Sequence, residues 1–246
     1  MFPYKDDNPT ILTPYVTFGI IALNVSVWLF VQHLGAGPAL SRSVCTLGLI
    51  PGELLHRVPP GYALPMGRGV SCVLDGGANT WLTPLTSMFL HGGWFHLIGN
   101  MWFLWVFGNN VEDSMGHARF ALFYVVTGLA AATAQVLVTP ASPIPMVGAS
   151  GAISGVMGAY ILLYPRVRVH MVVFLGFFIT TIAVPAYLML GYWLLLQVLG
   201  GIPALSNESG GVAFWAHAGG FAAGMLLISF FQNPELVARR RMLAPT

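Results

Sequence analysis

Long apolar stretches that carry no charged residue dominate the chain. No Asp, Glu, Lys or Arg occurs in four stretches, 8–41, 76–111, 120–165 and 169–207. Each stretch is longer than the roughly 20 apolar residues that a helix needs to cross a bilayer. The pattern predicts an all-α, polytopic membrane protein built as a bundle of six transmembrane helices, over 14–33, 93–111, 118–138, 149–164, 184–200 and 213–231.

The segments outside these spans divide the chain further. Residues 1–13 are expected to form a short N-terminus, 14–231 the six-helix membrane domain, and 232–246 a basic C-terminal tail. Within the domain, Pro and Gly repeatedly interrupt a long first loop over 34–92, so its apolar parts are too short to span. We expect part of this loop to lie at the membrane interface.

The segment 167–184 is apolar enough to form a span by itself. The link that follows it, 185–191, contains no charge and no polar cluster that would mark a membrane surface. We therefore interpret 167–184 as an interfacial or re-entrant segment that leads into the fifth span. The alternative, a seventh transmembrane helix, would move every later residue to the opposite face of the membrane.

Composition places the chain in a lipid bilayer and excludes some partners. Of its 246 residues, 56% are hydrophobic and 7% are charged, against about 25% charged in an ordinary soluble domain. The net charge is +2 and no basic stripe exists beyond residues 239–241, which excludes nucleic acid as a partner. The first residues lack a basic region followed by a small-residue cleavage site, so we expect no cleaved signal peptide.

Basic residues near span ends favour the cytoplasmic side of a membrane. They follow the second, fourth and sixth predicted spans, as Arg119, as Arg166 and Arg168, and as residues 239–241, whereas the links 139–147 and 201–212 contain none. Both termini are therefore expected in the cytoplasm, and these three spans enter the membrane from its outer face. Three polar residues near the starts of these spans then lie at similar depth: His96, Ser150 and His217.

Polar side chains at membrane depth are costly and usually face the bundle interior or a wet cavity. His96 and Asn100 lie four residues apart, so they share one face of the second span. Asn100 could instead bond only to a neighbouring helix, and His96 could lie among lipid headgroups; the sequence leaves these alternatives open. His91 precedes the span and is expected to be a loop or interface residue.

Small residues accompany Ser150 and His217 at helical spacing. Ser150 stands between Gly148 and Gly151, where a polar loop becomes an apolar helix, a position that a simple helix cap would also occupy. Glycine strips, which are common, let membrane helices approach closely. One strip lies on the fourth span and one on the sixth: Gly151, Gly155 and Gly158, and Gly220 and Gly224. If the strips face each other, the imidazole of His217 reaches the hydroxyl of Ser150.

A serine becomes a strong nucleophile when an adjacent base takes its proton, and histidine is the usual base. The free N–H groups at the start of the Ser150 helix, together with the side chains of His96 and Asn100, can stabilise an oxyanion. The acidic residues lie at span ends or in loops, so we infer a Ser150–His217 dyad without a third member. No zinc motif, intramembrane aspartate pair or phosphate loop occurs, and no metal or other cofactor is expected.

Three motifs closely resemble those of the rhomboid family of intramembrane serine proteases. They are His-Gly-Gly-Trp-Phe-His-Leu-Ile-Gly-Asn at 91–100, Gly-Ala-Ser-Gly at 148–151 and Ala-His-Ala-Gly-Gly-Phe-Ala-Ala-Gly at 216–224. The resemblance covers roughly 81–231. It implies that Ser150 is the nucleophile and His217 the general base, and that His96 and Asn100 form the oxyanion site with the N–H of Ser150.

Other positions match the family less uniformly. Glu112 and Gly116 resemble the Glu-x-x-x-Gly that follows the second span in this family, where the acid has a structural role. Leu82 follows Trp81, whereas many members have Trp-Arg, so a stabilising role of that arginine is not carried over. The segment 167–184 is also longer than the corresponding link of the simplest members.

The family resemblance implies cleavage of single-span membrane proteins near the outer end of their transmembrane segments. Transmembrane protein substrates are therefore the expected partners, and the compact six-span core favours a bacterial inner membrane. The alternative is a catalytically inactive member that binds or escorts transmembrane clients. The presence of all four expected site residues argues against it. A transporter is disfavoured because no charged residue lies in mid-membrane.

Cys45 and Cys72 both fall in the predicted outer first loop. In an oxidising compartment they could pair and staple that loop. They could equally remain free thiols, and the sequence leaves both alternatives open.

Overall fold

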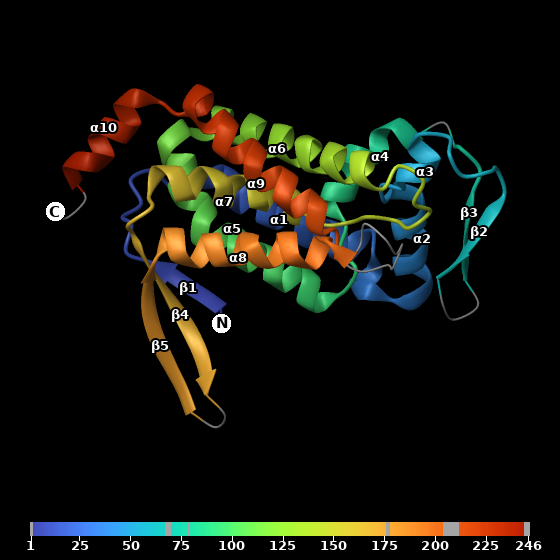
Figure 1. The fold of residues 1–246 in the computed structure, drawn as a ribbon, viewed down its shortest axis with the longest axis horizontal. Helices are drawn as coiled ribbons and strands as arrows, with labels where there is room; N and C mark the ends of the chain where they lie inside the picture. The colour runs from blue at the N-terminus through green and yellow to red at the C-terminus, as the bar shows by residue number, and fades with distance from the viewer. Residues whose placement is uncertain (1, 67–69, 78, 176–177, 204–211, 244–246) are drawn as a thin grey trace.

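Helices of 14 to 22 residues are the longest elements of the computed structural model (Figure 1), which describes residues 2–66, 70–77, 79–175, 178–203 and 212–243. Six of them occur among these residues: α1 (Tyr15–Phe30), α5 (Trp94–Met115), α6 (His117–Val138), α7 (Ser150–Leu163), α8 (Ala186–Gly201) and α9 (Phe214–Phe231). Each predicted span falls on one of these helices, and the ends agree within a few residues. The positions of the predicted helices are therefore confirmed.

By length and composition, α6 and α9 are long and apolar enough to cross a membrane. The helices α1, α7 and α8 are apolar but shorter, and α5 ends in a polar turn that contains Glu112 and Asp113. The crossing of a bilayer by all six helices stays a prediction.

Some predictions fall on residues that the structure does not describe. They include most of the link 201–212, because residues 204–211 are outside the described part. Residues 67–69 of the first loop, 176–177 of the segment 167–184 and 244–246 of the tail are outside it as well.

A single glycine separates α5 from α6. Gly116 has φ +79°, a left-handed conformation that favours glycine. Its N–H donates to the carbonyl of Glu112 at 2.7 Å, which closes the last turn of α5. The chain therefore turns back at once, and α6 begins beside the helix that it follows.

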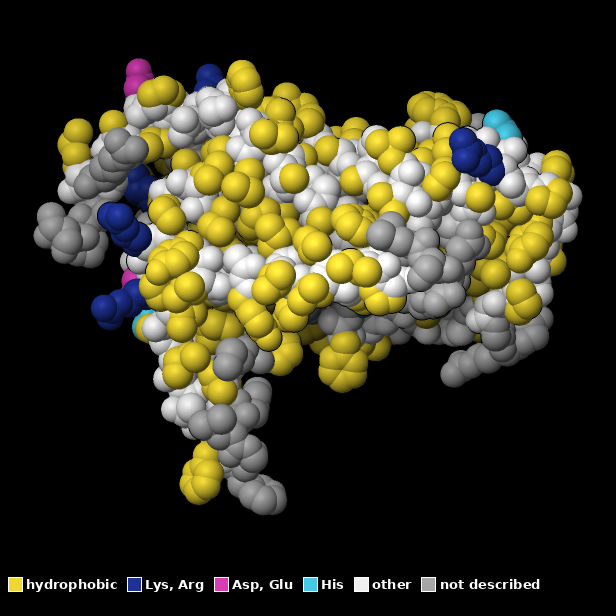
Figure 2. Space-filling model, in the orientation of Figure 1, with side chains coloured by type: hydrophobic (Ala, Val, Ile, Leu, Met, Phe, Trp, Pro, Cys, Tyr) yellow, Lys and Arg dark blue, Asp and Glu magenta, His cyan; other side chains and the backbone are white. Residues whose placement is uncertain are grey.

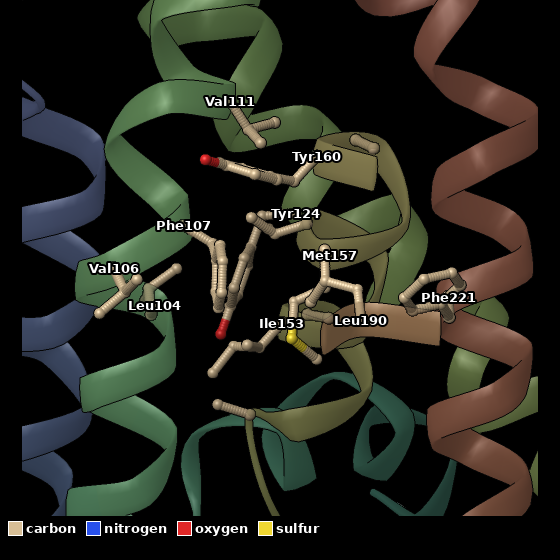
Figure 3. Packing of buried hydrophobic residues seen from close by; sticks show 14 of the residues in the cluster. Leu104, Val106, Phe107, Val111, Tyr124, Ile153, Met157, Tyr160, Leu190 and Phe221 are labelled. Carbon is tan, nitrogen blue, oxygen red and sulfur yellow. The ribbon is translucent and has the colours of Figure 1, made fainter. Parts of the chain in front are cut away.

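The helix α7 lies at the centre of the bundle. All ten of its residues from 151 to 160 are buried, as expected for a helix that is apolar on every side. Its side chains Ile153, Met157 and Tyr160 meet Phe107 of α5 and Tyr124 of α6 (Figure 3). The ring of Tyr160 lies edge-on to that of Phe107 at 5.0 Å. The start of α7, where Ser150 lies, is thus fixed by packing from several sides.

The predicted first loop is folded rather than irregular. It contains short helices and one antiparallel hairpin, β2–β3, which gather at one end of the bundle (Figure 1). Their bounds are η1 (His33–Gly35), α2 (Gly37–Leu47), α3 (Pro51–Leu54), β2 (Tyr62–Pro65), β3 (Ser71–Leu74), η2 (Thr80–Leu82), α4 (Thr83–Thr86) and η3 (Ser87–Phe89). A disulfide between Cys45 and Cys72 joins α2 to β3, so the structure pairs the two cysteines.

The segment 167–184 is not a helix, and its placement at the membrane stays a prediction. It forms an antiparallel hairpin of β4 (Arg168–Leu175) and β5 (Phe178–Pro185), and β1 (Phe2–Asp6) adds a third strand beside β4. The β-branched and aromatic residues that fill this segment favour strands. The prediction of an all-α fold was therefore wrong in this respect, and the chain is mostly helical with two small sheets.

The basic tail is also more ordered than predicted. Residues Pro234–Leu243 form α10, which folds back onto the bundle with Arg240 buried. The guanidinium of Arg240 donates to the carbonyl of Asn110 at 3.1 Å and to Asp113 at 3.3 Å, and lies 4.4 Å from the centre of the Tyr164 ring. This arginine is a structural part of the bundle, because its charge is paired inside it.

On the face that Figure 2 shows, apolar side chains lie along the length of the bundle, whereas the charged side chains gather toward its two ends. The exposed apolar residues include large ones on several helices: Trp105, Leu122, Leu137, Leu195, Leu226 and Phe230. Soluble monomers rarely expose apolar surface so continuously. The surface therefore has the pattern of a membrane protein.

Candidate active site

Two polar side chains from α7 and α9 meet near the end of the bundle that carries the first loop. Ser150 is the first residue of α7, and His217 is the fourth residue of α9. The Oγ of Ser150 lies 2.7 Å from Nε2 of His217, although 67 residues separate them in the chain. The structure thus brings the predicted nucleophile and the predicted base into hydrogen-bond contact.

Glycines let the backbones of α7 and α9 touch. A Cβ atom on Gly220 would lie 2.1 Å from the carbonyl oxygen of Gly151, and one on Gly224 would lie 2.0 Å from that of Gly155. Real Cβ atoms do not approach so closely, so glycine is required on α9 at both positions. This close approach carries His217 to Ser150.

Two of the three glycines of the α7 strip face a different neighbour from the one that the sequence suggested. A Cβ on Gly151 would lie 2.7 Å from Ala131, and one on Gly155 would lie 2.4 Å from Thr127, both on α6. The two predicted strips therefore do not simply face each other. The backbone of α7 fits between α6 and α9. Gly151 and Gly155 pack against α6, whereas a Cβ on Gly158 would lie 2.1 Å from the carbonyl oxygen of Phe221 on α9.

Gly148 allows an imidazole to lie against the backbone beside Ser150. Its φ is +133°, and a Cβ there would lie 2.7 Å from Nε2 of His96 and 3.4 Å from Oγ of Ser150. Its N–H donates to the carbonyl of Ser87 at 2.9 Å, which holds the turn in place. A side chain at this position would displace His96 from the site.

The hydrogen bonding of His96 fixes which ring nitrogen carries the proton. The backbone N–H of Gly92 donates to Nδ1 of His96 at 3.2 Å, so Nδ1 is an acceptor. In a neutral imidazole the other nitrogen then carries the hydrogen. Nε2–H therefore faces Gly148 and Ser150 as a donor.

Asn100 adds a second unused donor. Its side chain is buried one turn along α5 from His96, and its Nδ2 has no hydrogen-bond partner within the described part of the chain. Buried amide groups are nearly always hydrogen-bonded. An unpartnered N–H in the cavity that Ser150 also lines is thus available to an oxygen that arrives with a ligand.

A cavity of about 610 Å³ contains all four of these side chains. It is lined by residues from five of the six long helices and from the links that precede α7 and α9: among them His96, Asn100, Phe103, Gln135, Ser150, Trp193 and His217. The cavity is large enough for an extended peptide segment and for water. The serine hydroxyl is therefore accessible rather than sealed in the core.

One residue of the site was missed by the sequence interpretation. Nδ1 of His217 lies 2.8 Å from Oε1 of Gln197 on α8, although no third member of the dyad was expected. A signal was present, because Gln197 is the single amide side chain in the predicted span 184–200. Polar residues at that depth are usually functional or paired.

His91 is a loop residue as predicted, but it is buried rather than at a surface. The backbone N–H of His91 donates to Oε1 of Gln32, whose Nε2 donates back to the His91 carbonyl, both at 2.8 Å. The ring packs edge-on against His96 at 5.2 Å. Burial, followed by the charge of the neighbouring His96, lowers the pKa of His91 to about 3.

Glu112 lies at the opposite end of α5, about 24 Å from His96 along the helix axis. Its carboxylate accepts hydrogen bonds from the N–H groups of Val16 and Thr17, at 3.0 and 2.8 Å, and contacts Nδ1 of His117 at 2.5 Å. These contacts satisfy free N–H groups at the start of α1. Glu112 therefore joins α1 to α5 and does not enter the site.

Among the described residues, no group of three or more His, Cys, Asp or Glu side chains is arranged so that it could hold a metal ion.

Ser154, one turn after Ser150, is buried, and its Oγ donates to the Ser150 carbonyl at 2.6 Å. Its hydroxyl is thus engaged within the helix.

The family model and the relatives that match this chain belong to one family. The Rhomboid domain model matches residues 78–233. Rhomboid protease GluP of Bacillus subtilis is 43% identical over 84 residues, 34% of this chain and 16% of that protein. Rhomboid-like protein 11, chloroplastic, of Arabidopsis thaliana is 36% identical over 96 residues, 39% of this chain and 34% of that protein.

A longer match is to Rhomboid protein 1, mitochondrial, of Saccharomyces cerevisiae. It is 30% identical over 168 residues, 66% of this chain and 45% of that protein. The chain spans less than two thirds of the length of the curated relatives that it matches.

Proposed function

This chain belongs to the rhomboid family of membrane proteins, and from that premise we propose that it is an intramembrane serine endopeptidase. It cleaves the transmembrane segments of single-span membrane proteins with a dyad of Ser150 and His217. The observation that carries the proposal is the 2.7 Å contact between Oγ of Ser150 and Nε2 of His217 inside an open cavity. The similarity to Rhomboid protease GluP of Bacillus subtilis supports it.

In the proposed reaction, Nε2 of His217 takes the proton of the Ser150 hydroxyl as Oγ attacks the scissile carbonyl carbon. The negative oxygen of the tetrahedral intermediate accepts hydrogen bonds from Nε2–H of His96, Nδ2–H of Asn100 and the N–H of Ser150. The imidazolium then gives its proton to the leaving amine, and an acyl-serine remains. Water, deprotonated by His217, attacks this ester, the bond between the acyl carbon and Oγ breaks, and the imidazolium returns the proton to Ser150 as the second product leaves.

We place the six long helices across the membrane with both termini in the cytoplasm of a bacterial cell. The apolar sides of the bundle and the position of charged residues at its ends support this placement (Figure 2). The site then lies near the outer face together with the first loop. The hairpin β4–β5, with exposed Phe178 and Ile179, lies at the opposite end of the bundle and would contact the inner membrane surface.

A transmembrane substrate must reach the cavity from the lipid and expose a backbone carbonyl, because an intact helix hides these groups. The cavity is lined by Phe103 of α5 and Trp193 of α8. Outward movement of α8 would open a path between these helices. A disulfide engineered between α5 and α8 should abolish the cleavage of a membrane substrate, and unchanged turnover would refute this route.

Labelling with a serine-reactive fluorophosphonate tests the dyad on detergent-solubilised protein. We expect wild type to be labelled and both Ser150→Ala and His217→Ala to lose labelling. Ser154→Ala is the matched control, because its hydroxyl bonds only within α7, and it should label like wild type. Equal labelling of wild type and Ser150→Ala would refute the proposal. A folded wild-type protein that is neither labelled nor able to cleave would favour an inactive, client-binding role.

A further inference from the structure

Both ring nitrogens of His217 have a partner. Nε2 contacts Oγ of Ser150 at 2.7 Å, and Nδ1 contacts Oε1 of Gln197 at 2.8 Å. The two contacts lie on opposite sides of one ring and come from different helices, α7 and α8. Together they fix the rotation of the imidazole as well as its position.

A second hydrogen bond determines which way the amide of Gln197 points. Its Nε2 donates to the carbonyl oxygen of Trp193 at 3.2 Å, one turn earlier on α8. A carbonyl oxygen requires a donor, so the nitrogen of the amide must face Trp193 and the oxygen must face His217. The orientation of the amide is therefore set by the helix itself.

This orientation has a consequence for the tautomer of His217. An amide oxygen only accepts hydrogen bonds, so Nδ1 of the imidazole must carry the hydrogen. The lone pair of a neutral ring then lies on Nε2, the nitrogen that faces the Ser150 hydroxyl. The opposite tautomer would leave two acceptors facing each other and could not take the serine proton.

We propose that Gln197 is the positioning residue of the dyad, so that the site works as a Ser–His–Gln arrangement with a neutral third member. This inference rests on the proposed protease function. When His217 becomes an imidazolium, Nδ1–H still donates to Gln197, and the amide dipole stabilises the charge. A carboxylate would do this more strongly, but its burial among apolar side chains is costly.

The location of Gln197 links this role to the position of α8. Trp193, on the same face of α8, places its ring 5.8 Å from His217 and stacks on Phe221 at 6.1 Å. Outward movement of α8, the route proposed for substrate entry, would separate Gln197 from His217. The base is therefore correctly oriented only while α8 lies against α9.

The rate of fluorophosphonate labelling measures this role without a known substrate. In Gln197→Met, which keeps the size but removes the acceptor, we expect the maximal labelling rate to fall about 10- to 100-fold, as for a lost hydrogen bond to a charged group. The half-saturating concentration should stay within about twofold of wild type. Leu196→Met, on the exposed side of the same helix, is the matched control and should not change either value.

The variant Gln197→Glu separates positioning from mere packing. It restores an acceptor, so it should recover a large part of the rate that Gln197→Met loses. Its negative charge favours the imidazolium, so the acidic limb of the rate profile should move to higher pH. A merely structural role predicts neither the recovery nor the movement. A wild-type labelling rate in Gln197→Met would overturn the proposal. So would a Gln197→Glu variant whose labelling rate stays as low as that of Gln197→Met and whose pH profile has the same acidic limb as wild type.

A spectroscopic measurement distinguishes a failure of this proposal from a failure of the protease function. The nitrogen shifts of the His217 ring, identified by their loss in His217→Ala, report which nitrogen carries the hydrogen. We expect the Nδ1–H form in wild type and a mixture in Gln197→Met. The same mixture in both proteins would overturn the role of Gln197 even if the enzyme is active. The expected shifts in an enzyme without activity would overturn the protease function alone.

Discussion

Gly224 of α9 lies directly against the carbonyl of Gly155 on α7, so closely that a Cβ on Gly224 would be 2.0 Å from that oxygen. Neither residue touches the dyad. Their contact nevertheless sets the distance between the two helices that carry Ser150 and His217. The reactive geometry thus depends on backbone packing about two turns deeper in the bundle.

The variant Gly224→Ala should therefore lower the stability of the protein and abolish the reactivity of Ser150. The added methyl group must push α9 away from α7, and overpacking of this kind costs about 1–3 kcal/mol or more. We expect a lower unfolding temperature and the loss of fluorophosphonate labelling. Gly19→Ala in α1 is the control, because nothing lies within 4 Å of its Cβ position. It should be neutral or stabilising by up to about 1 kcal/mol.

Asn100→Ala should lower reactivity without unfolding the protein. Its Nδ2 makes no hydrogen bond within the described residues, so its loss leaves no partner unsatisfied in the resting site. Removal of one oxyanion donor typically costs about 10²- to 10³-fold in rate. Labelling kinetics and thermal unfolding should thus diverge. Ile98→Ala, at an exposed position of the same helix, should leave the labelling rate unchanged, and a wild-type rate in Asn100→Ala would exclude an oxyanion role.

The disulfide between Cys45 and Cys72 should stabilise the first loop. The two cysteines are 27 residues apart in sequence, and closing a loop of that length contributes about 3–4 kcal/mol by the chain-entropy relation. Reducing agent should therefore lower the unfolding temperature of wild type and leave that of a Cys45→Ala, Cys72→Ala double variant unchanged. Peptide mapping with and without reductant should show the linked pair. A reductant-insensitive wild type would contradict the pairing.

Stability should fall in mild acid because of His91. Its pKa is about 3 in the folded protein and about 6.5 in an unfolded chain. Below pH 6.5 the His91 imidazole therefore binds a proton in the unfolded chain but not in the folded protein. At pH 5 this difference lowers the free energy of unfolding by roughly 2 kcal/mol. Unfolding in detergent should show this loss between pH 7 and pH 5. His91→Phe should show a shallower pH dependence, and an identical slope in both proteins would contradict the prediction.

Two neighbouring arginines of α10, Arg239 and Arg240, differ in burial and therefore allow a controlled comparison. Arg240 is buried and bonded to Asp113 and to the carbonyl of Asn110, whereas Arg239 is exposed. Arg240→Ala leaves the Asp113 carboxylate buried without its cation, which typically costs about 3–5 kcal/mol. Arg239→Ala should cost less than about 0.5 kcal/mol. Similar unfolding temperatures for the two variants would show that α10 does not pack as described.

The helices could be located from the sequence because charge-free stretches of sufficient length leave few alternatives to a spanning helix. The hairpin β4–β5 could not, since a short, mostly apolar run does not show by its pattern whether it forms a strand or a helix. The prediction for 167–184 excluded a seventh helix correctly, but it did not consider that the segment could pair with itself. β4 pairs with β5 along its whole length, and β1 from the N-terminal end of the chain adds the third strand.

The sequence by itself determined which residues lie at the same end of the bundle, because the number of helices and their direction place His96, Ser150 and His217 near three helix starts. Only the tertiary structure decided which side chains meet. The helices are apolar on nearly every side, so no polar face indicates how each is rotated about its axis. Glycine contacts set how α7 packs against α6 and α9, and so bring His217 to Ser150. The packing of α8 and α5 brings Gln197 to Nδ1 of His217 and turns Nε2–H of His96 toward Ser150.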